Sequence, residues 1–196
     1  MLLLVRHGES TGNAEGLLAG RIDLPLTERG LAQARAVGAT LTGVARVVAS
    51  PLARTRATAE ALGLGLPIEV DERWVEVDYG RFDGQPLSSV PPEVWRAWRG
   101  DPDFRPPGGE TLAEVGTRVS AACEELFAVD GDGARGDGHV VVVSHVSPIK
   151  AATCWSLGLP AAGTWRLHLS TGSVTRIGHG PGGAVLHGYN DTPWSR

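Results

Sequence analysis

Two short apolar runs, each followed by a histidine, constrain this chain more than any other feature. Residues 2–5 (LLLV) stop at Arg6-His7, and residues 140–144 (VVVVS) stop at His145. Apolar runs of this length, bounded by polar residues, are typical of strands buried on both faces of a parallel sheet. Because ligands bind at the carboxyl ends of such strands, the two histidines and the adjacent arginine predict a site for an anionic phosphoryl group.

Helical and strand-like segments alternate along the rest of the chain. After a loop at residues 8–25, a first helix is predicted to follow the N-cap Thr27. A second is predicted to begin with Ser50 as N-cap and Pro51 as the first helical residue. Two further helices are predicted, one beginning at Thr111 and one at residues 148–157. Further strands are predicted at Val44–Ala49 and, as an antiparallel pair, at residues 166–177 and 184–189. This order favours a three-layer α/β/α sandwich with a mostly parallel central sheet.

Composition favours one globular domain over residues 1–196, with 42% apolar and 20% charged residues. The net charge of −4 argues against a nucleic-acid partner, so an anionic substrate needs a local positive pocket. No run approaches the roughly 20 apolar residues of a membrane span, and residues 1–5 are too short for a signal peptide, so no membrane partner and a cytoplasmic location are expected. Cys123 and Cys154 are expected to be buried apolar residues.

Two regions depart from this regular order. Residues 74–107 are rich in Trp, Arg, Pro and Gly and are predicted to be a variable lid or insert. Within them, Trp95, Arg96, Trp98 and Arg99 form either a lid over a leaving group or an amphipathic helix with both tryptophans packed inward. Residues 129–138 are predicted to be a surface connector, and their G-x-G-x-x-G spacing at Gly131, Gly133 and Gly136 precedes a strand, which argues against a dinucleotide fold.

Two more clusters carry candidate chemistry at element boundaries. Arg54 lies in the first turn of a predicted helix, where free N–H groups and a guanidinium fork suit phosphate, whereas Arg56 fits a solvated helix face. A carboxyl group after Trp74 lies in a predicted apolar wall, where burial raises its pKa and prepares a general acid. Glu76, Asp78 and Asp83 are the carboxyl groups of this segment, and the residues alone leave the choice open.

In these motifs the chain resembles the histidine phosphatase superfamily, also called the phosphoglycerate-mutase-like family. The matching stretches are LLVRHGESTGN at 3–13, DLPLTERG at 23–30, SPLART at 50–55, VEVDYG at 75–80, PGGET at 107–111, VVSH at 142–145 and NDT at 190–192. They follow the family's order over nearly the whole chain. The resemblance implies a phosphoglycerate mutase-like fold.

The resemblance also implies roles for individual residues. His7 is the nucleophile that takes the phosphoryl group, Glu76 is the proton donor, and the phosphate is surrounded by Arg6, Arg54 and a protonated His145. No metal or other cofactor is implied, and the two histidines lack the local spacing of a metal site.

Secondary contacts to phosphate and substrate are implied for Ser10 and Asn13. Val146 replaces the family's glycine, and its backbone N–H is expected to remain available to phosphate. Lys150, one helical turn further on, is either a substrate-side cation or a surface residue.

The implied activity is metal-independent hydrolysis of a small phosphorylated metabolite through a phosphohistidine on His7. A 2,3-bisphosphoglycerate-dependent mutase is the first alternative, and the short segment between Glu76 and His145 favours the phosphatase. A phosphate-binding scaffold and a phosphohistidine-protein phosphatase are further alternatives. The run SHVSPIK at 144–150 is similar to α-ribazole phosphatase-like members and broad acid phosphatases, so α-ribazole phosphate, sugar phosphates and phosphoglycerate derivatives stay open, as do monomer and homodimer.

Overall fold

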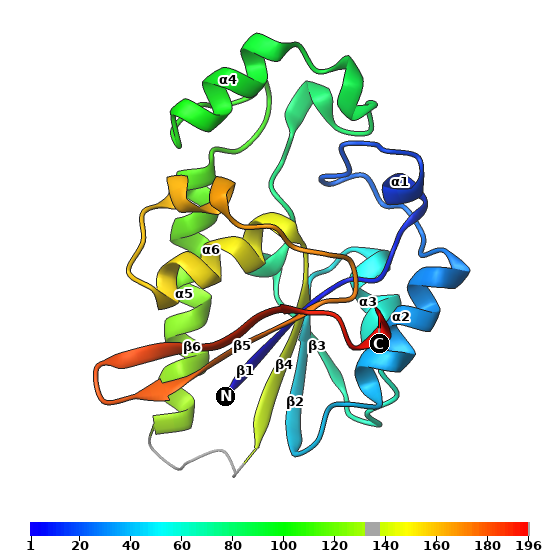
Figure 1. Cartoon of the computed structure of the whole chain (residues 1–196), viewed down its shortest axis with the longest axis vertical. Helices are drawn as coiled ribbons and strands as arrows, with labels where there is room; N and C mark the ends of the chain where they lie inside the picture. Colours follow the sequence, from blue (N-terminus) through cyan, green and yellow to red (C-terminus); the bar gives the residue numbers. More distant parts are fainter. Residues whose placement is uncertain (132–137, 196) are drawn as a thin grey trace.

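The computed structural model of this protein describes residues 1–131 and 138–195. A six-stranded sheet in the order β3-β2-β4-β1-β5-β6 forms its centre (Figure 1). The strands are β1 (Leu2–Arg6), β2 (Val44–Ala49), β3 (Ile68–Val70), β4 (His139–Ser144), β5 (Val174–Gly180) and β6 (Gly183–Asp191). Strands β1 to β4 pair in parallel, and β5 and β6 add an antiparallel end. The predicted mostly parallel sheet with late antiparallel strands is therefore confirmed.

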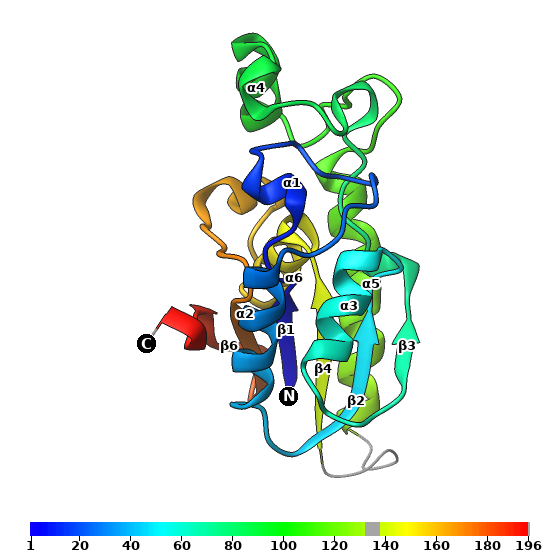
Figure 2. The same ribbon diagram turned by 90° about the vertical axis from the view of Figure 1, so that its right-hand side faces the viewer.

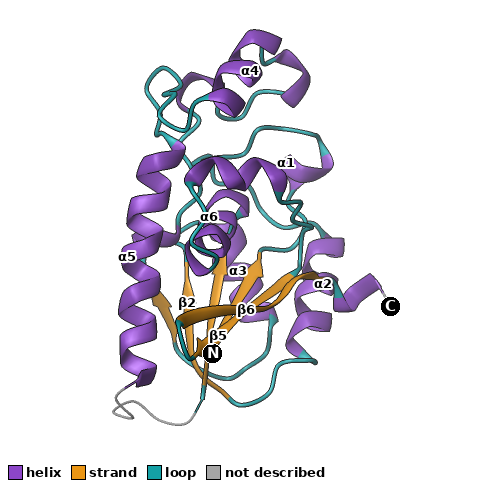
Figure 3. Ribbon diagram, turned by 60° about the vertical axis from the view of Figure 1, so that its left-hand side comes forward, coloured by secondary structure: helices purple, strands orange, loops and turns teal. Residues whose placement is uncertain are grey.

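Helices cover both faces of this sheet and complete the predicted three layers. In Figures 2 and 3, α2 (Glu28–Gly38) and α3 (Ala53–Ala61) lie on one face, and α5 (Leu112–Gly131) and α6 (Val146–Ser156) lie on the other. The short α1 (Thr11–Ala14) and α4 (Pro92–Gly100) lie beyond the carboxyl ends of the parallel strands. Short 3-10 helices are η1 (Glu72–Trp74), η2 (Gly80–Phe82), η3 (Leu87–Ser89), η4 (Ala161–Arg166) and η5 (Pro193–Ser195).

The two central strands bury both of their faces. Leu2 and Leu4 belong to the core under α5 and α6, while Leu3 and Val5 belong to the core under α2 and α3. Because successive strand residues face opposite sides, an unbroken apolar run is needed where both sides are covered. This packing explains the sequence signal from which the fold was predicted.

The register of β1 and β4 sets the two histidines at one edge of the sheet. Arg6 pairs with Ser144, so His7 and His145 each follow directly on their strands. The N–H of His7 donates to the carbonyl of Ser144 at 3.0 Å. The imidazole rings meet edge to face with centroids 5.1 Å apart.

Several predicted boundaries are wrong. Helix α3 begins at Ala53 with Leu52 as N-cap, because the hydroxyl of Ser50 is used by His145 instead. Helix α6 begins at Val146, two residues before Pro148. A proline is tolerated there because N–H groups in the first turn of a helix have no intrahelical acceptor, so its missing N–H costs no hydrogen bond.

Two other segments were assigned the wrong structure. The strand expected from residue 166 begins at Val174, because Ala161–Arg166 is a 3-10 helix. The loop predicted at 8–25 contains α1, and the edge strand β3 was not predicted. Helix α5 continues to Gly131, and residues 132–137 of the connector expected at 129–138, including Gly133 and Gly136, lie outside the described residues.

The region expected to be a lid or insert lies over the carboxyl end of the sheet. Its α4 packs Trp98 into a small core of its own with Phe82, Val90 and Leu112. Within residues 1–131 and 138–195, no helix is both long and apolar enough to span a bilayer.

Candidate active site

His7 is held as a neutral imidazole with one free ring nitrogen. Its Nδ1 lies 2.7 Å from the carbonyl oxygen of Gly8, so Nδ1–H donates there and Nε2 keeps its lone pair. Burial lowers the pKa of His7 well below 6.5, and the positive charges of Arg6 and Arg54 lower it further. Such an imidazole is unprotonated near neutral pH and can act as a nucleophile.

The loop after His7 is fixed by direct backbone packing on α2. A Cβ at Gly8 would collide with the backbone of Gly30, and a Cβ at Gly30 would collide with the backbone of Glu9. The Gly8 N–H also donates to the hydroxyl of Thr58 at 3.1 Å. The position of the loop that follows His7 is thus set largely by main-chain contacts.

Arg6 directs unused hydrogen-bonding capacity into this site. One guanidinium nitrogen, Nη1, donates to the carbonyl of Leu169 at 2.6 Å, whereas the buried Nε–H has no partner in the described part of the chain. Burial lowers the pKa of Arg6 to about 10, and the carboxylate of Glu76 opposes this shift. A buried cation with an unpartnered donor is suited to an anionic ligand.

Arg54 is clamped by a loop that approaches from the other side. Its guanidinium is fully buried and donates from Nη1 to the carbonyl of Ile22 at 2.8 Å and from Nη2 to that of Gly20 at 2.6 Å. Burial lowers the pKa of Arg54. Arg56, by contrast, is exposed, as its position in the sequence predicted.

His145 is also a neutral imidazole, which corrects the expectation that it is protonated. The Nε–H of Arg54 donates to Nδ1 of His145 at 3.2 Å, which requires a lone pair on that nitrogen. The remaining ring N–H, on Nε2, then donates to Oγ of Ser50 at 2.7 Å. Burial, followed by the charge of Arg54, lowers the pKa of His145 well below 6.5.

Glu76 is the buried carboxylate of this site. Its Oε1 accepts from the backbone N–H groups of Val77 at 2.8 Å and Ser147 at 3.1 Å, and its Oε2 accepts from that of Val146 at 3.1 Å. Two of these donors are the free N–H groups that begin α6, where the helix dipole favours negative charge. The Val146 N–H, expected to contact phosphate, is therefore already bound to Glu76.

The two carboxyl groups that rival Glu76 have hydrogen-bond partners of their own. Asp78 accepts from the N–H of Gly80 within its own turn, at 2.8 Å. Asp83 accepts three backbone N–H groups from the loop that clamps Arg54, at 2.7–2.9 Å, from Gly20, Arg21 and Ile22. Both side chains are thus structural, and Asp83 was missed as a positioning group because its partners lie about 60 residues away in the chain.

Ser10 and Asn13 bond to each other in the structure. The side-chain oxygen of Asn13 accepts from the N–H of Ser10 at 3.0 Å, and the Asn13 N–H donates to the Ser10 hydroxyl at 3.3 Å. This capping box begins α1 and orders the loop that follows His7. Their contact with a substrate stays a prediction.

An aromatic cavity of about 190 Å³, here called the chamber, opens beside Glu76. Three residues connect the two, because Val77, Val146 and Ser147 bind the Glu76 carboxylate and also line the chamber. The remaining wall is formed by Leu18, Tyr79, Leu87, Trp95, Trp98, Leu112, Lys150, Thr164 and Trp165. The chamber therefore directly adjoins the residues that hold the Glu76 carboxylate.

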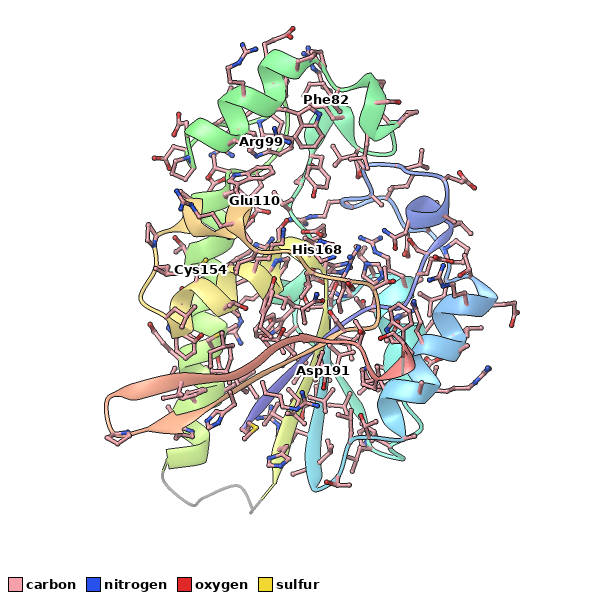
Figure 4. The ribbon with its side chains drawn as sticks, viewed as in Figure 1. Phe82, Arg99, Glu110, Cys154, His168 and Asp191 are labelled. Atoms are coloured by element: carbon pink, nitrogen blue, oxygen red, sulfur yellow. The ribbon has the colours of Figure 1, made fainter. Side chains whose placement is uncertain are left out.

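Helix α4 combines the two alternatives that its sequence left open. It is an amphipathic helix with Trp98 buried, and its tryptophans also line the chamber. The guanidinium of Arg99 stacks over Trp95 and Trp165 at 5.8 Å from each ring centroid, whereas Arg96 is exposed. In Figure 4, the labelled side chains of Arg99 and Phe82 show the position of this aromatic region below α4.

The charges of the site fit an anion. The buried Arg54 and the half-buried Arg6 face one buried carboxylate, and both histidines are neutral. Over residues 1–131 and 138–195, no cluster of three or more His, Cys, Asp or Glu side chains is arranged to hold a metal ion. The arrangement can bind a phosphoryl group, attack it with Nε2 of His7 and exchange a proton at Glu76.

Comparisons with known proteins agree with this geometry. Residues 2–192 match the histidine phosphatase superfamily (branch 1). The probable phosphoglycerate mutase GpmB of Enterobacter sp. (strain 638) is 34% identical over 97% of this chain and 86% of its own length. A solved mycobacterial glucosyl-3-phosphoglycerate phosphatase is 31% identical with a TM-score of 0.86, covering 97% of this chain and 98% of that one. The alpha-ribazole phosphatase from Shigella flexneri is 25% identical with a TM-score of 0.84, covering 97% and 96%.

Proposed function

Because this chain belongs to the histidine phosphatase superfamily (branch 1), we propose that it hydrolyses a small phosphorylated metabolite through a phosphohistidine on His7. The observation that carries this proposal is the hydrogen bond from Nδ1–H of His7 to Gly8, which leaves Nε2 with a free lone pair near the guanidinium groups of Arg6 and the buried Arg54. A nucleophile, cations for the phosphoryl oxygens and a carboxyl group for proton transfer are the parts that such a reaction needs.

In the first step, Nε2 of His7 attacks phosphorus. The N–P bond forms as the ester P–O bond breaks. Glu76, a carboxylate in the empty site, takes the proton of a monoanionic phosphomonoester and gives it to the leaving oxygen, so that a neutral alcohol departs. Arg6 and Arg54 stabilise the charge on the phosphoryl oxygens. His145 adds the Nε2–H now bonded to Ser50, which can turn to a phosphoryl oxygen without a change of charge.

In the second step, water attacks the phosphohistidine. The carboxylate of Glu76 takes the proton from that water, the N–P bond breaks, and inorganic phosphate leaves with the lone pair restored to His7. The three backbone N–H groups on Glu76 hold its carboxylate in one orientation for this proton transfer. General acid–base catalysis of this kind contributes about 10²–10⁴-fold.

A phosphatase is favoured over a mutase by the size of the chamber and by the short segment between Glu76 and His145. A mutase must retain a phosphorylated sugar acid while the phosphoryl group changes position. The chamber of about 190 Å³ is smaller than the roughly 300–1,000 Å³ of sites that enclose a drug-sized ligand. Release of a small alcohol before water enters suits this size, and the solved glucosyl-3-phosphoglycerate phosphatase is a supporting relative.

Hydrolysis of p-nitrophenyl phosphate from pH 4 to 9 with EDTA tests the proposal. Turnover by the native chain, with none by a folded His7→Ala variant, is the expected result. The native chain is also to be quenched and denatured in alkaline detergent after brief exposure to ³²P-labelled substrate, because phosphohistidine survives in base and hydrolyses in acid. Label on His7 is expected. Activity only with added 2,3-bisphosphoglycerate and a phosphoglycerate would replace the phosphatase by a mutase, and phosphate binding without turnover would replace it by a scaffold.

A further inference from the structure

Lys150 is the one lysine in a sequence with 18 basic residues. It lies on α6 four positions after Val146, so the two side chains share one face of the helix. Both line the chamber. The chain therefore places its single primary-amine side chain in the wall where a leaving group would lie.

The ammonium group of Lys150 lacks a partner in its half-buried position. Across residues 1–131 and 138–195, no hydrogen bond or ion pair reaches its Nζ. Burial lowers the pKa of Lys150, while the nearby carboxylate of Glu76 acts in the opposite direction. A desolvated cation is costly unless an opposite charge pairs with it, and the chamber wall supplies no acid.

Arg99, a cation beside the aromatic wall of the chamber, is already engaged. The Arg99 guanidinium stacks on Trp95 and Trp165, and Arg99 does not line the cavity. A second phosphate group carries up to two negative charges and normally takes several donors. One ammonium group, in a wall whose other polar side chains carry only uncharged groups, matches a single negative charge, such as a carboxylate.

We propose that Lys150 determines specificity by pairing with a carboxylate on the alcohol that leaves the phosphoryl group. This inference rests on the proposed phosphatase function and names its substrate class: phosphomonoesters of small carboxylated alcohols, with apolar or aromatic parts packed on the tryptophans. Lys150 acts in substrate selection, and the chemical step stays with His7 and Glu76.

Two substrate pairs that differ in a single charged group test this assignment. 3-Phosphoglycerate is compared with glycerol 3-phosphate, and 4-carboxyphenyl phosphate with 4-(hydroxymethyl)phenyl phosphate. In each pair a carboxylate is replaced by a hydroxymethyl group, and the ratio of kcat/KM within a pair is the readout. Lys150→Met removes the charge at similar volume, Lys150→Arg keeps a charge, and Arg56→Met removes a charge from an exposed face of α3 as the matched control.

The native chain is expected to prefer the carboxylated member of each pair by about 10-fold or more, the range for a hydrogen bond to a charged group. Lys150→Met should abolish that preference, mainly through KM, Lys150→Arg should keep part of it, and Arg56→Met should keep all of it. Because Lys150→Met removes a desolvated cation, its thermal unfolding midpoint is expected at or above that of the native chain. A midpoint in that range shows that the variant is folded.

The inference is overturned if Lys150→Met keeps the native preference for the carboxylated substrate. It is also overturned if Lys150→Met lowers kcat/KM equally for both members of a pair, because that result is expected if Lys150 serves only as a counter-charge to Glu76. If no phosphomonoester is turned over, the proposed function fails on its own. The preference is then measured as Kd ratios on the His7→Ala variant by calorimetry, where equal Kd values within a pair overturn the inference as well.

Discussion

The Nε–H of Arg54 donates to Nδ1 of His145 at 3.2 Å, which joins the two groups that would flank a phosphoryl group into one unit. The bond fixes the imidazole as the neutral tautomer with its proton on Nε2, and that proton meets Ser50 at 2.7 Å. A donor is therefore presented to the site without a third buried positive charge, which limits the electrostatic cost of the empty site.

Replacing Ser50 tests this tautomer. Ser50→Ala removes the acceptor of the Nε2–H of His145, and a buried donor without a partner costs about 1–3 kcal/mol. We expect urea denaturation to show a loss in that range and kcat to fall several-fold, with partial recovery in Ser50→Thr. Ser89→Ala, at an exposed serine that bonds only its own turn, is the control, and equal stability of the two alanine variants would contradict the assignment.

Glu76→Gln separates the two steps of the proposed reaction. The amide cannot protonate a leaving oxygen, so loss of kcat should be much larger with an alkyl phosphate, which needs that proton, than with p-nitrophenyl phosphate, which does not. Its NH₂ group also faces one of the backbone N–H donors that now bind the carboxylate, so a lower melting temperature is expected too. Equal kinetic losses with both leaving groups would transfer the role to another acid.

The two buried histidines predict a fall in stability on mild acidification. Their pKa values in the fold lie well below 6.5, so between those values and 6.5 the unfolded chain binds protons that the folded chain does not. The free energy of unfolding should therefore decrease as pH falls from 7 to 5, by up to about 1.4 kcal/mol per pH unit for each histidine. Urea midpoints measure the slope, and His145→Gln should make it shallower; a slope unchanged by that variant contradicts the expectation.

Asp83 is predicted to act on phosphate binding through Arg54. Its carboxylate accepts three N–H groups of the loop at 20–22, and the carbonyls of Gly20 and Ile22 hold the guanidinium. Asp83→Asn leaves at least one N–H unpaired, so the inhibition constant for inorganic phosphate should rise about 10-fold. Asp83→Glu should restore part of the affinity, whereas the exposed control Asp103→Asn should not change it; full phosphate affinity in Asp83→Asn would refute the link.

How far the sequence predicts this molecule depends on the range of each interaction. The strands that end at His7 and His145 were predictable because both of their faces are buried, which leaves a continuous apolar run in the sequence. The role of Ser50 was not, since a serine before a proline resembles a helix cap and its actual partner lies 95 residues away.

The same limit applies to the first turn of α6. A sequence shows that the N–H of Val146 is free of an intrahelical partner, but it does not show which acceptor reaches it. Glu76, 70 residues earlier in the chain, takes that donor. The residue types that meet at the site were therefore predictable from motifs, whereas the hydrogen bonds among them required the structure.

The backbone contact between Gly8 and Gly30 separates this protein into a fixed part and an adjustable part. The nucleophile rests on main-chain atoms of α2 that tolerate no added side chain, while the chamber is formed largely by side chains from α4, η4 and α6. Under the proposed function, substitutions in the chamber can thus change which alcohol is released without moving His7. A scaffold divided in this way can acquire new substrates by single steps while its reaction stays the same.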